Sequence, residues 1–214
     1  MLSRVYCAST IGVDARLIEV EVNRSGGLPK YFLVGLPDRA VSESKDRIDA
    51  ALKNADAFFP RGRITVNLAP ADLPKEGSAF DLPIAVSLLA VSEQIQIEKL
   101  EQSLILGELA LDGKLRPVKG VLPMAVEAKN QGLEYIILPK ENGPEAAVVD
   151  GIKVLPFSDL REVMTWFENE KSKSPLVINP KNLFSTNGKA DVLDFEDVRG
   201  QENVKRALEV AAAG

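Results

Sequence analysis

The stretch that decides the fold is Leu73-Pro74-Lys75-Glu76-Gly77-Ser78-Ala79-Phe80-Asp81-Leu82-Pro83-Ile84-Ala85, in the middle of the chain. It changes from a loop into an apolar run that continues to Val91 and predicts a buried helix. Either Ser78 begins this helix in a box-like cap with Asp81, or Asp81 is itself the N-cap and Pro83 falls in the first turn. In both cases we expect free backbone N–H groups at the helix start, where they favour an anion.

Strand-like runs occur on both sides of this stretch. Their apolar side chains alternate with polar ones, as in a half-buried strand, or form short runs between turn residues. The runs are residues 16–22, 31–34, 63–68, 104–111, 135–138 and 153–157. The early strands follow one another and the later ones alternate with helices. This order predicts an α+β fold, with a mixed sheet and helices packed on it.

Helix signals separate these strands. Asp38 is an expected N-cap, and in the helix that follows, Glu43 and Arg47 have the spacing of an i,i+4 ion pair. Gly132 stops a later helix, and Ser158 is the expected cap of the next one.

Composition limits the classes of function. The chain has 214 residues, a net charge of −5, one cysteine (Cys7) and no histidine. The lack of histidine excludes most zinc sites and the Ser-His-Asp triad, so we expect no bound metal. No disulfide is possible within the chain, and neither a signal peptide nor a membrane-spanning run is found. The cytoplasm is therefore the expected location, without a membrane partner.

The C-terminal part has a different character. Residues 171–192 are polar and hold Pro, Asn, Ser and Gly with few periodic apolar residues, as in a linker. Residues 193–214 contain Phe195-Glu196-Asp197-Val198-Arg199-Gly200-Gln201 followed by an amphipathic helix. We therefore expect a domain over residues 1–170, then the linker, then the start of a second module.

The central stretch is similar to the active-site segment of Lon-type Ser-Lys proteases, whose pattern is Pro-Lys-Asp-Gly-Pro-Ser-Ala-Gly. When residues 74–77 are aligned with it, the catalytic serine falls on Ala79. The second signature of these proteases, Pro-(Ile/Val)-Gly-Gly-(Leu/Ile)-Lys, resembles residues 117–122, and its lysine falls on Leu122. A methyl and an isobutyl group supply neither nucleophile nor base, so we expect no catalytic residues.

A one-residue slip would instead recruit Ser78 as the nucleophile, with Lys75 or Lys119 as its base. At a helix start such a slip turns the side chain by about 100°, away from the partner. We therefore expect Ser78 to cap and Ala79 to pack, and Lon-like peptidase activity is the least favoured alternative function.

Four stretches identify the family that the chain resembles: residues 34–41, 74–85, 107–120 and 197–214. They resemble the YifB/ComM family, often called magnesium chelatase-like AAA+ ATPases, over nearly the whole chain. The resemblance implies a Lon-protease-like domain of the ribosomal protein S5 domain 2-like fold without protease residues, then a linker and the first helix of an AAA+ module. It also places the phosphate loop after Gly214, so we expect these residues to end before the Walker A motif.

The resemblance further implies a function for the whole protein. ComM-type proteins are implicated in ATP-driven branch migration of DNA as hexameric rings, with ATP and Mg²⁺ as cofactors. By motif position, Val198, Gly200 and Gln201 would lie near the adenine. Most of the affinity for ATP comes from the phosphate cradle, its lysine and Mg²⁺, so we expect these residues alone to be non-catalytic.

Five basic residues are candidates for contacting DNA: Arg61 and Arg63 beside a strand, and Lys114, Arg116 and Lys119 around the Asp112-Gly113 turn. Such side chains can follow a phosphate backbone, although solvated surface charge is their commoner role. Aromatic residues for stacking bases are scarce, so we expect DNA binding to be weak, salt-sensitive and dependent on ring assembly.

Two other functions stay open. A magnesium chelatase motor subunit need not touch the metal, so the lack of ligands weakens this function without excluding it. In an assembly domain, the C-terminal helix would join copies of the chain through Val204, Leu208 and Ala211.

Overall fold

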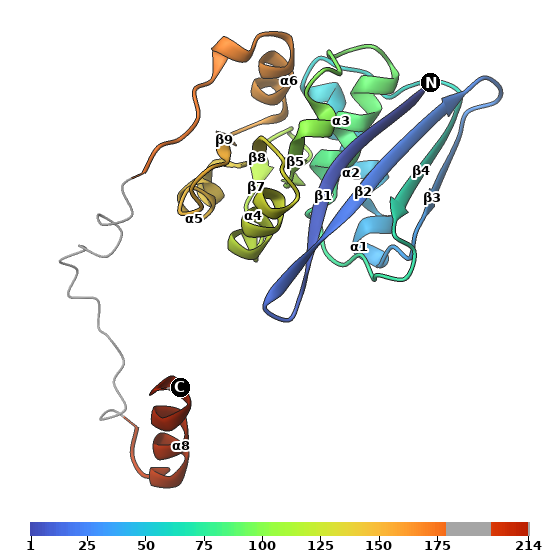
Figure 1. Ribbon diagram of the computed structural model, residues 1–214. Coiled ribbons are helices and arrows are strands. Elements are labelled where there is room, and N and C mark those ends of the chain that lie inside the picture. Colours follow the sequence, from blue (N-terminus) through green and yellow to red (C-terminus); the bar gives the residue numbers. More distant parts are fainter. Residues whose placement is uncertain (179–197, 214) are drawn as a thin grey trace. The chain divides into compact units, whose positions relative to one another are not determined.

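A seven-stranded mixed sheet, in the order β3-β4-β2-β1-β5-β8-β9, organises the first part of the chain (Figure 1). The computed structural model describes residues 1–178 and 198–213, which fall in two units divided after Ile178. The strands are β1 (Leu2–Ile11), β2 (Asp14–Ser25), β3 (Lys30–Val34), β4 (Arg63–Ala69), β5 (Ser103–Ile105), β8 (Tyr135–Pro139) and β9 (Lys153–Phe157), while β6 (Glu108–Leu109) and β7 (Leu115–Arg116) form a separate hairpin.

The sheet is mostly parallel. β2 pairs antiparallel with β1 and β4, and the other four neighbouring pairs are parallel. An antiparallel pair needs only a short turn, whereas parallel neighbours need a crossover. Helices supply the crossovers between β3 and β4, β5 and β8, and β8 and β9. The predicted mixed sheet with packed helices is thus confirmed, and its parallel character makes mixed α/β the better description than α+β.

The helices pack around this sheet. They are α1 (Arg39–Ser42), α2 (Ser44–Asn54), α3 (Asp81–Val91), α4 (Val121–Asn130), α5 (Gly143–Ala146) and α6 (Leu160–Glu168), with short 3₁₀ turns η1 (Leu100–Gln102), η2 (Lys140–Asn142) and η3 (Glu170–Ser172). Every residue of α3 is buried, because this helix packs against β1, β2 and α2. A helix covered on all sides is apolar all round, so the apolar run correctly predicted a buried helix.

Two local predictions about the helices were wrong. Glu43 pairs with Arg39 at 2.7 Å instead of with Arg47. The helix is interrupted at Glu43, between α1 and α2, and the side chain of Arg47 pairs with Asp81. Ser158 does not cap α6. Its carbonyl is held by the N–H of Leu115, and Asp159 accepts from the N–H of Glu162 at 2.9 Å instead.

Residues 171–178, which the sequence assigns to the linker, belong to the first unit. The N–H of Leu176 donates to the carbonyl of Val154 at 2.8 Å, and the ammonium of Lys173 lies 3.4 Å from the carboxylate of Glu162. The rest of the predicted linker, residues 179–192, lies outside the described residues.

The second unit contains α8 (Glu202–Ala213). Its apolar side chains are about half exposed, including Val204 at 51% and Leu208 at 50%. Over residues 1–178 and 198–213, no helix is long and apolar enough to cross a membrane.

Cys7 offers a probe of the core of the first unit. Its side chain in β1 is fully buried, and burial raises the pKa of the thiol to about 12. Only the thiolate reacts with iodoacetamide, so we expect no labelling of the native chain and full labelling in denaturant. Mass spectrometry after treatment at about pH 8 measures this. Val13→Cys on a Cys7→Ala background is the control, because Val13 is 89% exposed and this thiol should label at once. Rapid labelling of native Cys7 would contradict the packing of β1.

Candidate functional site

A cavity of about 780 Å³ lies beside the loop of the central stretch that leads into α3. Three segments form its walls: the end of β1, the loop that leads into α3, and the chain around β6 and β7. The residues that matter most for its chemistry are Ser9, Thr10, Ser78, Ala79, Glu108 and Lys119.

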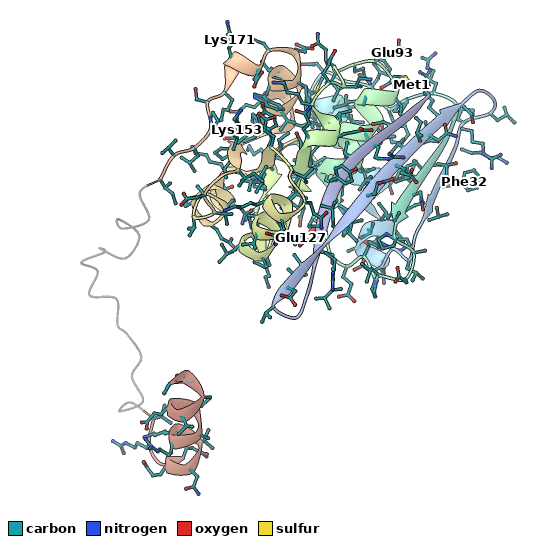
Figure 2. The ribbon with its side chains drawn as sticks, viewed as in Figure 1. Met1, Phe32, Glu93, Glu127, Lys153 and Lys171 are labelled. Carbon is teal, nitrogen blue, oxygen red and sulfur yellow. The ribbon has the colours of Figure 1, made fainter. Side chains whose placement is uncertain are left out.

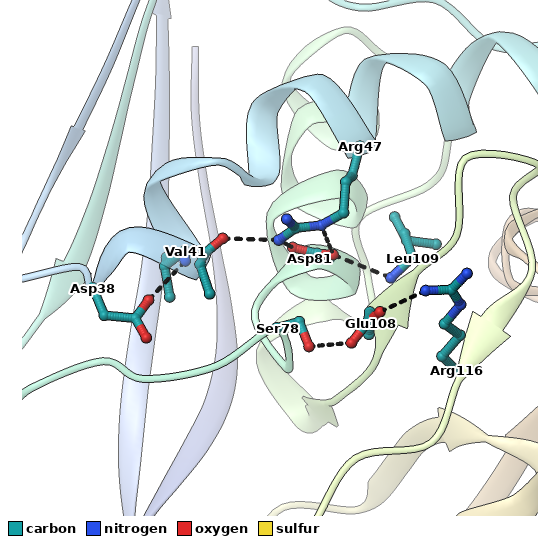
Figure 3. Close-up of polar contacts among 9 residues, drawn as sticks. Asp38, Val41, Arg47, Ser78, Asp81, Glu108, Leu109 and Arg116 are labelled. Carbon is teal, nitrogen blue, oxygen red and sulfur yellow. Dashed lines mark hydrogen bonds and ion pairs between the residues drawn. The ribbon is translucent and has the colours of Figure 1, made fainter.

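A buried ion pair holds the helices beside this cavity (Figure 3). Arg47 Nε and Nη2 donate to the two carboxylate oxygens of Asp81, each at 2.8 Å. Arg47 Nη2 also donates to the carbonyl of Ala40 at 2.8 Å, and Asp81 accepts from the N–H of Leu109 at 3.2 Å. Asp81 is fully buried, and burial raises its pKa despite the opposing effect of Arg47. The pair thus joins α1, α2, α3 and β6.

The start of α3 does not offer an anion site, contrary to the prediction. Phe80 occupies the N-cap position without a side-chain cap, so neither Ser78 nor Asp81 caps the helix. The N–H of Asp81 donates to the carbonyl of Ser78 at 3.2 Å, and that of Leu82 donates to the carbonyl of Gly107 at 3.0 Å. Pro83 has no N–H. Backbone carbonyls therefore satisfy the donors that we expected to be free.

Ser78 is engaged by a carboxylate. Its hydroxyl donates to Glu108, which also accepts from Arg116 Nη1 at 3.1 Å (Figure 3). Burial alone would raise the pKa of Glu108, but the hydrogen bonds from Ser78 and Arg116 outweigh burial and lower it. A carboxylate with a lowered pKa is a poor general base.

The lysines near Ser78 do not form a protease dyad with it. Lys75 is fully buried, its ammonium donates to the carbonyl of Pro70, and burial lowers its pKa. Lys119 lines the same cavity as Ser78, but the hydroxyl of Ser78 is bonded to Glu108.

The two positions that match the Lon dyad carry no reactive group. Ala79 lines the main cavity through its methyl group. Leu122 is 41% exposed and lines a second cavity, between α4 and the β1–β2 turn. Neither a methyl nor an isobutyl group can act as a nucleophile or as a base.

The five basic candidates for DNA contact fall into two groups at opposite ends of α3. Arg24 donates to the carbonyl of Arg61 at 3.1 Å and to that of Val91, the last residue of α3, at 3.4 Å. Arg116 instead lies beside Glu108 and Ser78, near the first turn of α3. The eleven residues of α3 span roughly 16 Å. The two groups are therefore separated by roughly the length of α3.

Contacts within the chain already occupy several of these basic groups. The guanidinium of Arg63 lies 4.9 Å from the centroid of the Phe32 ring. Phe32 is on the edge strand β3 (Figure 2). Lys114 pairs with Asp112 at 3.1 Å, and Arg116 with Glu108 at 3.1 Å. Lys119 is exposed, and no ion pair of Lys119 is found within residues 1–178. Contact of the five with DNA stays a prediction.

The three residues expected near adenine lie together before α8. Gly200 and Gln201 have positive φ angles of 71° and 61°, and the carbonyl of Gln201 accepts from the N–H groups of Val204 and Lys205, each at 2.9 Å. Val198 is 45% exposed. Across the part of the chain that the structure describes, no group of three or more His, Cys, Asp or Glu residues could hold a metal ion.

Glu108→Gln is expected to destabilise the chain at neutral pH by about 1 kcal/mol, because Ser78 and Arg116 lose a charged acceptor. The folded-state pKa of Glu108 is lowered, so its contribution is present above the unfolded pKa and is lost as pH falls through the folded value. The stability gap between parent and variant should therefore close below about pH 4. Urea unfolding across this range measures it, and a gap independent of pH would contradict the network.

The site and the fold together define a class: a mixed α/β domain with a cavity beside the start of α3, where alanine stands at the position of the serine in the Lon-type pattern. Leucine stands at the position of the lysine, and it lines a separate cavity. Residues 20–142 match the family model described as "Subunit ChlI of Mg-chelatase", which covers more than half of the chain. The chain belongs to this Mg-chelatase-like family, in its YifB/ComM branch.

Relatives match over the whole chain. It is 44% identical over 215 residues to Competence protein ComM of Haemophilus influenzae, and 43% identical over 213 residues to Uncharacterized protein YifB of Escherichia coli. These alignments cover 100% of this chain but 42% and 41% of the relatives, so the chain spans about two fifths of their length. The Lon protease of Lachnoclostridium phytofermentans is 22% identical over 165 residues, which cover 71% of this chain and 20% of the protease.

Proposed function

We propose that this chain is the N-terminal part of an AAA+ ATPase of the ComM kind. Residues 1–170 would be a Lon-protease-like domain of the ribosomal protein S5 domain 2-like fold that no longer cuts peptide bonds. Residues 171–192 would be the linker, and 193–214 the start of the ATPase module. The observation that carries the proposal is the 44% identity to ComM, which runs through both described units and across the apolar dyad positions.

The whole protein would be a hexameric ring that migrates DNA branches in the cytoplasm, with DNA and further copies of itself as partners. ATP and Mg²⁺ would be its cofactors. Val198, Gly200 and Gln201 are exposed or lie in an exposed turn before α8, so they are accessible to an adenine ring. Among residues 198–213 only Arg199, Lys205 and Arg206 are basic. Without a phosphate cradle they fit a minor share of a nucleotide site, not the whole of it.

The test uses the whole protein and a four-way DNA junction. We expect ATP hydrolysis that DNA stimulates, and ATP-dependent movement of the junction, whereas residues 1–214 alone hydrolyse no ATP. Binding of DNA by residues 1–214 should be weak and should weaken further with salt. Tight binding of single-stranded DNA by these residues at high salt would contradict the proposal.

A magnesium chelatase motor subunit is the second candidate, favoured by the family model that matches residues 20–142. Complementation separates the two functions: the intact gene should restore branch migration, and not tetrapyrrole synthesis, in strains that lack each activity. Restored tetrapyrrole synthesis would favour the second candidate.

Peptidase activity is tested with casein. We expect no cleavage by the chain, and no difference when Ser78 is replaced by alanine, because the Ser78 hydroxyl is bonded to Glu108. Cleavage that Ser78→Ala abolishes would overturn the assignment of a non-cutting domain.

A further inference from the structure

One edge of β1 is left without a neighbouring strand where it borders the main cavity. On its other edge β1 pairs with β2 from Leu2 to Ile11. On the cavity side it pairs with β5 at a single position, Tyr6 opposite Leu104. β5 ends at Ile105, and Gly107 then donates to the carbonyl of Ala79 at 3.1 Å, away from β1. Residues 8–11 line the cavity instead of pairing with a strand there.

The register shows which backbone groups point into this cavity. Met1 and Arg24 exchange two hydrogen bonds, from Arg24 N at 2.9 Å and from the N-terminal amino group at 2.8 Å. Backbone groups alternate direction along a strand, and the β1–β2 register is continuous. The backbone N–H and C=O groups of the odd-numbered residues of β1 therefore point toward β2. Those of Ala8 and Thr10 point toward the cavity. A strand edge of this kind can pair with another extended chain.

The opposite wall leaves room for such a chain. It is formed by Gly77, Ser78 and Ala79, and the cavity of about 780 Å³ between this wall and β1 is open to solvent. The four residues 8–11 extend over roughly 13 Å, enough for several main-chain hydrogen bonds. The side chain that would lie beside the main chain of a bound polypeptide is the methyl group of Ala79, which cannot attack a peptide bond.

The charges that line the cavity favour a polypeptide over a nucleic acid. Three carboxylates, those of Asp38, Glu76 and Glu108, line it together with one ammonium group, that of Lys119. Arg116 pairs with Glu108 at 3.1 Å, so the carboxylates of Asp38 and Glu76 leave one negative charge in excess over Lys119. This excess of negative charge repels a phosphate backbone. It suits an uncharged peptide backbone with neutral or basic side chains.

We propose that this groove binds an extended polypeptide segment with neutral or basic side chains, which adds as a strand to the edge of β1 at Ala8 and Thr10 and is released uncut. The inference rests on the proposed loss of peptide cleavage. Binding of this kind requires the free edge of β1 and the open groove, but no nucleophile and no base.

The probe is a fluorescein-labelled peptide of about ten residues that alternates threonine and lysine, so that it favours a strand. Fluorescence anisotropy with the 214-residue chain measures its affinity, and a peptide alternating threonine and glutamate is the matched control. We expect the lysine peptide to bind at least about tenfold more tightly than the glutamate peptide. In the complex, the amide of Thr10 should become protected from hydrogen exchange.

Thr10→Pro removes the N–H at the edge of β1 but leaves the bonds to β2, and proline is tolerated at such an edge. We expect it to weaken binding by about tenfold, whereas Thr10→Ala keeps the N–H and should change binding by less than about twofold. Ala79→Phe fills the groove from the opposite wall and should also abolish binding, which keeps the test decisive if Thr10→Pro destabilises β1.

The outcomes separate this inference from the proposed function. Equal binding by the parent, Thr10→Pro and Ala79→Phe would overturn the groove site, and so would displacement of the peptide by an oligothymidine. In either case the proposed ATPase function stands. A peptide that is bound at this edge and cut would support the groove while overturning the non-cutting domain.

Discussion

Arg47→Met is expected to lower the free energy of unfolding by about 3–5 kcal/mol, because it leaves the carboxylate of Asp81 buried without its partner. Asp81 is fully buried, and Arg47 supplies two of the three hydrogen bonds to its carboxylate, the third coming from the N–H of Leu109. The variant also removes the bond from Arg47 to Ala40, which joins α1 to α2. Urea unfolding followed by circular dichroism measures the loss.

Two further variants test whether the unpaired carboxylate of Asp81 causes the loss of stability. Arg39→Met removes a surface ion pair in which Arg39 is 92% exposed, and we expect no measurable change in stability. Arg47→Met combined with Asp81→Leu replaces both charges by apolar groups. It should recover much of the loss, because the cost arises from the unpaired charge more than from the missing pair. If the double variant were as unstable as Arg47→Met alone, the buried carboxylate would not be the cause.

The pH dependence of Arg47→Met follows from the same carboxyl group. Burial already raises the pKa of Asp81, and loss of Arg47 raises it further. A group whose pKa is higher in the folded state stabilises below its unfolded pKa, and this contribution is lost as pH rises through the folded value. We therefore expect the loss of unfolding free energy in Arg47→Met to be largest at neutral pH and to become smaller as acid protonates Asp81. A penalty that grows toward acid would contradict this origin.

The sequence predicted those features whose signals are local. The apolar run to Val91 indicated a buried helix, and Asp38 indicated an N-cap whose side chain indeed accepts from the N–H of Val41 at 2.8 Å. Both depend on residues within one or two turns of the chain. The motif alignment placed Ala79 at the position of the catalytic serine, and we expected this residue to pack; in the structure it lines the main cavity.

The predictions that were wrong concern hydrogen-bond and ion-pair partners that are distant in sequence. Arg47 has an acidic residue at helical spacing, Glu43, yet bonds to Asp81, which lies 34 residues away. The first N–H groups of α3 were expected to be free, but the carbonyl of Gly107 reaches Leu82 from the end of another strand. Helical spacing contains no information on such contacts. The free edge of β1 was missed for the same reason, since it depends on where β5 ends.

Gly35→Ala is expected to be the most disruptive single substitution, with a loss of more than about 4 kcal/mol or no folded protein at all. Gly35 has φ of 104°, which side chains rarely adopt, and a Cβ there would lie 2.1 Å from the carbonyl oxygen of Leu68. The contact is with the backbone of β4, so no side-chain movement can relieve it. The comparison is Gly26→Ala, where nothing lies within 4 Å and the stability should stay nearly unchanged.

The consequence of Gly35→Ala reaches the cavity. Just after Gly35, Pro37 forms a bridge with Lys75, and the N–H of Asp38 donates to the carbonyl of Lys75 at 2.9 Å. Asp38 then accepts from the N–H of Gly77 at 2.9 Å, so the exit of β3 fixes the loop that forms the wall opposite β1. Thermal unfolding compares the two glycine variants, and equal stability would show that β3 and β4 do not approach so closely. If a weakly folded Gly35→Ala chain is recovered, it should also bind the threonine–lysine peptide less tightly than Gly26→Ala, because the wall of the groove would no longer be held in place.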